Sequence, residues 1–196
     1  MEVLIDVPGP RRWIPRRATG RAAAFGIVIA SINCLAASAP VDEYQVKAAF
    51  IYNFAKFVQW PANAFQRPSD PISICLLGQD PFGSSLDDTV ANRTIDGRSL
   101  TIRRLANVKQ VAGCHVLFIG SAEDKRLPSV VAGIRATGVL TIGDSDFSGA
   151  DDVVINFKLE SGKVRFDINV DAAEREKLRI SSRLLSLAHI VESNRK

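Results

Sequence analysis

Apolar side chains recur along this chain in stretches that predict alternating helices and strands. Residues 42–60 carry apolar side chains at the helical spacing of about 100° per residue, with Asp42 suited to cap the start and Pro61 to stop the helix. A further helical pattern begins near Pro81, and others cover residues near 107–111 and 122–136. Between them stand four short apolar runs typical of buried strands, at 72–77, 100–105, 116–119 and 139–143.

Continuous apolar strands separated by helices predict a mostly parallel sheet with helices on both faces. The pattern changes after residue 152, where 153–159 and 164–170 flank a Ser-Gly turn and predict an antiparallel hairpin with one solvent-facing side. Residues 171–191 carry a narrow apolar stripe at helical spacing, with an interruption near 178–182 where Ser181 or Ser182 could cap a second helix. We therefore expect an α/β, Rossmann-like three-layer sandwich with a C-terminal antiparallel hairpin and helix.

The predicted first helix has one cation on its apolar side. Val46, Phe50 and Phe54 mark the apolar face, and Lys47 projects into the middle of it. One interpretation is that the stem of Lys47 lies along the core while its ammonium group reaches water. The other is a cleft lysine that meets an acidic side chain or an anionic ligand. In that case Lys47 and Phe54 mark a small-molecule cleft.

Residues 1–39 are predicted to direct export rather than to form part of the fold. Five arginines between 11 and 21 precede the uncharged, mostly apolar stretch 22–37, and small residues at 36–39 provide a cleavage site. The alternative is an uncleaved amphipathic anchor. We expect cleavage after Ser38 or Ala39, which leaves residues 40–196 as a single exported domain.

The net charge of the whole chain, +4, is misleading because it is concentrated in that leader. Removing residues 1–39 takes away five of the 25 basic and two of the 21 acidic residues, which leaves +1. A basic surface of the kind that binds nucleic acid is therefore not expected.

Two cysteines, Cys75 and Cys114, follow the leader. In an oxidising compartment a pair of cysteines predicts a disulfide. Both stand at apolar runs, and neighbouring strands about 4.8 Å apart would bring their Cα atoms to a bridging distance. The alternative is two separately buried thiols. Neither belongs to a C-x-x-C pair, so a catalytic redox motif is not indicated.

The motifs of common enzymes are not found. The segment 78–83 (GQDPFG) lacks the G-x-G-x-x-G spacing of a dinucleotide-binding turn, and 143–147 is not the G-x-S-x-G turn of a hydrolase. His115 is expected to be a buried, hydrogen-bonded imidazole. An acidic loop is the remaining catalytic lead, as a metal site or as a solvated turn: Asp144, Asp146, Asp151 and Asp152. We expect no enzyme, cofactor or metal.

Several segments together resemble the YfiR family of periplasmic repressor proteins. They are 43–61 (EYQVKAAFIYNFAKFVQWP), 78–83, 114–119, 139–142, 155–157, 164–169 and 178–188, so the resemblance spans 43 to about 191. It implies that Cys75 and Cys114 form the core disulfide of the family. Some members carry a second cysteine pair near 147–152, which this chain does not have.

The resemblance implies a protein that binds the periplasmic region of an inner-membrane diguanylate cyclase or sensor kinase. As a repressor of a cyclase it would lower cyclic di-GMP and biofilm formation. The alternative is a periplasmic small-molecule-binding sensor module that works with a sensor kinase or receptor. An amphipathic C-terminal helix would also permit a homodimer.

A repressor of this kind needs a surface whose affinity differs between two states of its partner. Candidates are Arg165, Asp167 and Asn169 on the solvent side of the predicted hairpin, with Trp60 as an exposed aromatic. The alternative is that these are ordinary solvent-facing positions.

Overall fold

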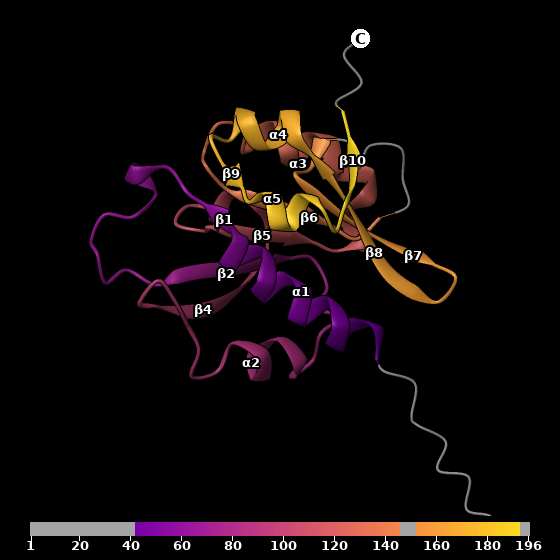
Figure 1. Ribbon diagram of the computed structural model, residues 1–196, viewed down its shortest axis with the longest axis horizontal. Coiled ribbons are helices and arrows are strands. Elements are labelled where there is room, and N and C mark those ends of the chain that lie inside the picture. The colour runs from indigo at the N-terminus through magenta and orange to yellow at the C-terminus, as the bar shows by residue number, and fades with distance from the viewer. Residues whose placement is uncertain (1–41, 146–151, 193–196) are drawn as a thin grey trace, which may run out of the picture. The chain divides into compact units, whose positions relative to one another are not determined.

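A computed structural model describes residues 42–145 and 152–192, which fold around an eight-stranded sheet (Figure 1). Within them the helices are α1 (Glu43–Phe57), α2 (Ser85–Val90), α3 (Leu127–Gly133), α4 (Val170–Arg175) and α5 (Ser182–Leu185). Three 3-10 helices are η1 (Ala62–Ala64), η2 (Val108–Gln110) and η3 (Ser121–Arg126). The strands are β1 (Val58–Gln59), β2 (Ile72–Leu77), β3 (Thr94–Ile95), β4 (Arg98–Leu105), β5 (Val116–Ile119), β6 (Leu140–Gly143), β7 (Ile155–Glu160), β8 (Lys163–Asn169), β9 (Arg179–Ile180) and β10 (His189–Val191).

The large sheet follows the order β10-β8-β7-β6-β5-β2-β4-β3. Its neighbours are parallel except for the hairpins β3–β4 and β7–β8, so the predicted mostly parallel α/β sandwich is confirmed. The chain leaves β2 for β4 on one side and then crosses to β5 on the other. The strand order therefore reverses at β2, and crevices beside the carboxyl ends of such strands are where this class of sheet binds ligands.

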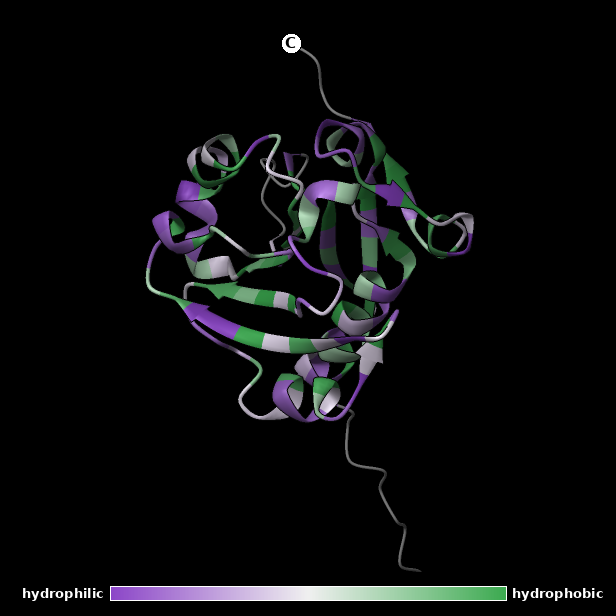
Figure 2. Ribbon diagram, turned by 90° about the vertical axis from the view of Figure 1, so that its left-hand side faces the viewer, coloured by the Kyte–Doolittle hydropathy of each residue, from purple (hydrophilic) through white to green (hydrophobic). Residues whose placement is uncertain are grey.

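Alternate residues of the central strands belong to two separate hydrophobic cores. Ile74 and Leu76 of β2 point toward α1, α2 and α5, where Phe54 and Leu86 are fully buried. Cys75 and Leu77 point the other way, toward α3 and its buried Leu127, Val130 and Val131. Figure 2 shows the resulting hydrophobic strands in the interior. A strand covered on both faces has no polar side, which explains its continuous apolar sequence.

The predicted disulfide is present and lies on the α3 side of the sheet. Cys75 of β2 and Cys114, just before β5, are bridged with a Cα–Cα separation of 5.9 Å. β2 and β5 are adjacent and parallel, as the prediction required. The alternative of two separate thiols is therefore wrong.

Three predicted elements are corrected by the structure. α1 begins as predicted, with the Asp42 carboxylate accepting from Tyr44 N–H, but it ends at Phe57 because Val58–Gln59 pairs with β9. α2 begins at Ser85, so Pro81 lies in the preceding turn and not in the helix. The tail is not a continuous helix: it forms α4, β9, α5 and β10, although Ser181 does cap α5.

The predicted export signal, residues 1–39, lies outside the described residues. Among the residues that are described, none of the helices is long and apolar enough to cross a membrane.

Candidate functional site

A polar cleft lies where β5 and β6 end. Ser121 follows β5, Asp144 and Ser145 follow β6, and the start of α1 contributes Glu43, Tyr44 and Lys47. With Phe157 and Leu159 these residues line a cleft of about 220 Å³. Strands that run in parallel bring their carboxyl ends to one edge, and this edge collects the polar side chains.

Lys47 is the central residue of this cleft. Its side chain is 4% exposed, and its Nζ lies 2.5 Å from Asp144 Oδ1 and also contacts a Glu43 carboxylate oxygen. Nζ also lies 4.7 Å from the ring centroid of Tyr44, whose hydroxyl donates to Asp144 Oδ2 over 3.1 Å. Burial opposes the charge of the ammonium, but the hydrogen bonds to Asp144 and Glu43 outweigh it and raise the pKa of Lys47. Lys47 therefore stays protonated.

The structure decides between the two interpretations of Lys47. The ammonium does not reach water; it meets acidic side chains inside a cleft. Because two carboxylates already surround it, Lys47 is not free to bind an anionic ligand. Phe54, predicted to share the cleft, is wrong as a lining residue: it is fully buried and packs on Phe157 and Phe166.

The side chain of Glu123 lies over the turn that follows β2, at the strand-order reversal. Gly78 follows β2 with φ +90°, and an added Cβ there would lie 3.0 Å from Glu123 Cγ. Glu123 is buried and pairs with Arg126 over 2.5 Å. A phosphate-binding fold keeps backbone amides accessible at this place, whereas here a carboxylate covers it.

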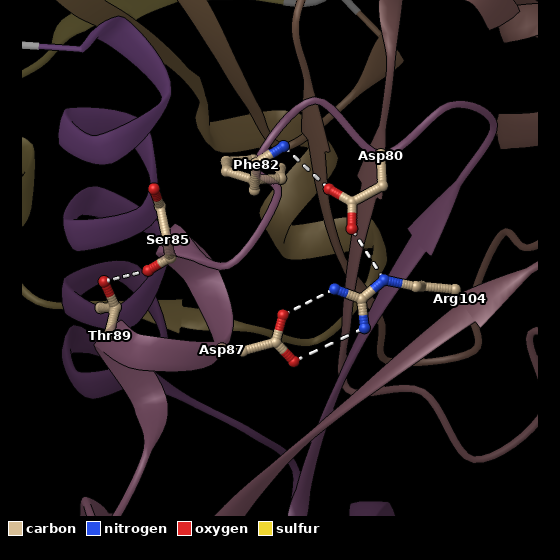
Figure 3. A network of polar contacts seen from close by, with 6 residues as sticks. All are labelled: Asp80, Phe82, Ser85, Asp87, Thr89 and Arg104. Carbon is tan, nitrogen blue, oxygen red and sulfur yellow. Dashed lines mark hydrogen bonds and ion pairs between the residues drawn. The ribbon is translucent and has the colours of Figure 1, made fainter.

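The turn after β2 is fixed by an ion-pair network that the sequence did not indicate (Figure 3). Arg104 of β4 donates from Nε to Asp80 over 2.7 Å and from Nη2 to Asp87 of α2 over 2.6 Å. Asp80 also accepts from Phe82 N–H, and the Phe82 ring packs on Phe118. The network therefore holds α2 against the sheet beside the Lys47 cleft.

The acidic loop is only partly described. Asp144 forms an ion pair with Lys47 and accepts a hydrogen bond from the Tyr44 hydroxyl, and Asp152 pairs with Arg135 over 3.4 Å. Asp146 and Asp151 lie outside the described residues. Within residues 42–145 and 152–192, no group of three or more metal-ligating side chains comes together.

His115 connects three segments near the disulfide. Its Nδ1 accepts from Ser73 N–H of β2 over 3.1 Å, its Nε2 lies 3.1 Å from Ala64 O of η1, and its ring stacks on Phe65 at 4.3 Å. The predicted buried, hydrogen-bonded imidazole is therefore found. Burial, and the nearby Arg98 guanidinium, lower the pKa of His115 below its ordinary value of 6.5.

This geometry predicts acid sensitivity. In the folded chain His115 must lose its proton to accept from Ser73, while the unfolded imidazole protonates near pH 6.5. Stability from His115 should thus be complete above pH 6.5 and decline as the pH falls through the lowered folded pKa. Urea titrations at a pH of about 7.5 and about 5 should show a larger loss for the wild type than for His115→Asn. Equal losses of stability in the wild type and in His115→Asn would contradict a role of His115 in acid sensitivity.

Two of the four residues predicted to face a partner are buried. Arg165 is exposed, but Asp167 and Asn169 are buried at 8% and 1% exposure, so the predicted solvent-facing side of the hairpin is wrong for them. The reason is tertiary: β10 pairs with β8, Lys158 and His189 meet Asp167, and Asn169 caps α4. Trp60 is half-buried, and its Nε1 donates to His115 O.

One surface was missed by sequence reasoning. Gln45, Val46, Ala49, Phe50 and Asn53 line a mostly apolar groove of about 370 Å³ on the outer side of α1, here called the α1 groove. The sequence did contain an indication of this groove, because the apolar arc of the helix is broader than one sheet face can cover.

Comparisons with known proteins give one family. The profile of the YfiR/HmsC-like family matches residues 44–189. The curated proteins contain no match. Among solved structures, a crystal structure of an ABC domain in complex with L-Trp from Streptococcus pneumonia is 10% identical, with a TM-score of 0.49 over 76% of this chain. The chain spans 60% of that solved protein, and a likeness at this level carries no argument about function.

Proposed function

Because the chain belongs to the YfiR/HmsC-like family, we propose that it is a periplasmic regulatory protein that represses an inner-membrane signalling enzyme. The enzyme is a diguanylate cyclase whose periplasmic region the protein binds. Repression lowers cyclic di-GMP and biofilm formation. The observation that carries this proposal is the family match, which spans nearly all of the described residues.

Two features of the molecule support this function. The Cys75–Cys114 bridge suits an oxidising compartment, in agreement with the predicted export signal at 1–39. The polar cleft holds a lysine already neutralised by carboxylates, which favours a structural role over a reactive one. A regulator of this kind acts through differential affinity for two states of its partner and needs no reactive group.

Deletion of the gene tests the proposal. We expect cyclic di-GMP and surface-attached growth to rise in the deletion strain, and both to return when the full chain is supplied from a plasmid. A chain without residues 1–39 should be made at a similar level and fail to restore them, because it remains in the cytoplasm. Unchanged cyclic di-GMP after deletion, in a strain that expresses a cyclase with a periplasmic region, would refute the proposal.

A second candidate function is a small-molecule-binding sensor, and the cleft of about 220 Å³ favours it. Tyr44, Ser121 and Ser145 line the cleft around the ion pairs that Lys47 makes, which suits a polar organic ligand better than an anion. A screen of periplasmic metabolites by thermal shift should then find a stabilising compound whose effect Ser121→Leu abolishes. A stabilising effect that persists in Ser121→Leu would place the ligand elsewhere.

A further inference from the structure

The α1 groove has the shape of a helix-binding site. Gln45, Ala49 and Asn53 form one row of side chains four residues apart, and Val46 and Phe50 form the next. A groove between two such rows accepts the corresponding row of another helix, at a crossing angle of about −50°. The amide of Asn53 donates to Ala49 O over 2.9 Å. The Asn53 side chain is therefore held against the helix and does not obstruct the groove.

Exposed apolar residues are also found on the sheet face that α1 covers. In the described part of the chain, the large apolar side chains that are exposed are Leu159 (53%), Leu187 (68%) and Ile190 (44%). Leu159 lies two residues from Phe157, whose ring contacts Phe50, so it shares the sheet face that α1 covers. Ile190 is in register with the buried Ile168 on that same face. Figure 1 shows α5 and β8 beside α1, and both elements contact α1.

Charge defines what can bind here. None of the five residues that line the α1 groove is ionised, and three of them, Val46, Ala49 and Phe50, are apolar, so the groove favours an uncharged, largely apolar contact. One helical turn further, Lys56 Nζ and Arg183 Cζ lie 5.9 and 5.6 Å from the ring centroid of Phe57. Both side chains are exposed. Phe57 continues the row of Gln45, Ala49 and Asn53, so the two cations beside its ring stand at the end of the groove.

We propose that the α1 groove binds an amphipathic helix of the membrane signalling protein that this chain regulates. The helix has apolar residues four apart against Val46 and Phe50, and an acidic side chain near Lys56 and Arg183. This inference rests on the proposed function and names the surface through which it operates.

A pair of matched variants tests the groove in the strain that carries the gene. Ala49→Arg places a charge in the groove, whereas Ala132→Arg makes the same change at an exposed helical position on α3, across the sheet. With equal protein levels and equal melting temperatures, Ala49→Arg should raise cyclic di-GMP to the deletion level and Ala132→Arg should leave it at the wild-type level. Lys56→Glu should also derepress, because it reverses the charge that meets the acidic side chain.

A crosslink identifies the occupant independently of the regulatory output. A photoreactive benzophenone side chain at position 49 should crosslink, in intact cells, to a helical segment of a membrane protein, mapped by mass spectrometry. Wild-type cyclic di-GMP in Ala49→Arg, a crosslink to a second copy of this chain, or the absence of a crosslink would overturn the inference while the proposed function stands. Unchanged cyclic di-GMP in the deletion strain would instead refute the proposed function, and the crosslink would still decide what occupies the groove.

Discussion

Replacing Cys75 and Cys114 with alanine in the chain that begins at residue 40 should lower the free energy of unfolding by about 4 kcal/mol. The bridge joins residues 39 apart in sequence, and on the chain-entropy description a closed loop of that length restricts the unfolded chain by about this amount. Both sulfurs are buried between β2, β5 and α3, so the variant also loses some packing. Urea unfolding followed by circular dichroism measures the difference.

The same experiment contains its own control. A reducing agent should lower the stability of the wild type by a similar amount and leave the double alanine variant unchanged, because no bridge remains to be reduced. A loss below about 1 kcal/mol in the double variant would show that the bridge contributes little to the free energy of unfolding.

The central sheet was predictable because its strands are buried on both faces. Such strands are continuous apolar runs in any context, so 72–77 and 116–119 were assigned to within a residue. The tail was mispredicted because its elements are two to six residues long and depend on distant partners. β9 forms only because it pairs with β1, and β10 only because it pairs with β8. The local spacing of apolar residues carries no information about those distant contacts.

The candidate site was predictable only in part, because contacts between residues distant in sequence assemble it. The position of Lys47 on an apolar face indicated an unusual lysine, and the structure supplies the reason for it. Its partner Asp144 lies 97 residues away and is brought near only by the placement of β6 next to β5. The burial of Asp167 likewise follows from β10, an element absent from the predicted hairpin.

Lys47→Met should lower the free energy of unfolding by about 3 kcal/mol, and Asp144→Asn by a similar amount. Each single variant leaves charge in the cleft without its main partner, because the side chains of Lys47 and Asp144 are only 4% and 9% exposed. We expect the lower end of the usual range for buried pairs, since Glu43 remains to neutralise Lys47 when Asp144 is changed.

The double variant Lys47→Met/Asp144→Asn should cost clearly less than the sum of the two single variants, because it removes both charges at once. The pair Arg135–Asp152 is the matched control: its side chains are 53% and 38% exposed, so Asp152→Asn should change stability by about 1 kcal/mol or less. Because the pKa of Lys47 is raised in the folded chain, the stability that its charge contributes is complete below the ordinary lysine pKa of 10.5. That contribution is lost only as the pH rises through the higher folded pKa. Additive single variants would show that Lys47 and Asp144 are not coupled, and the polar cleft would then need another explanation for its buried lysine.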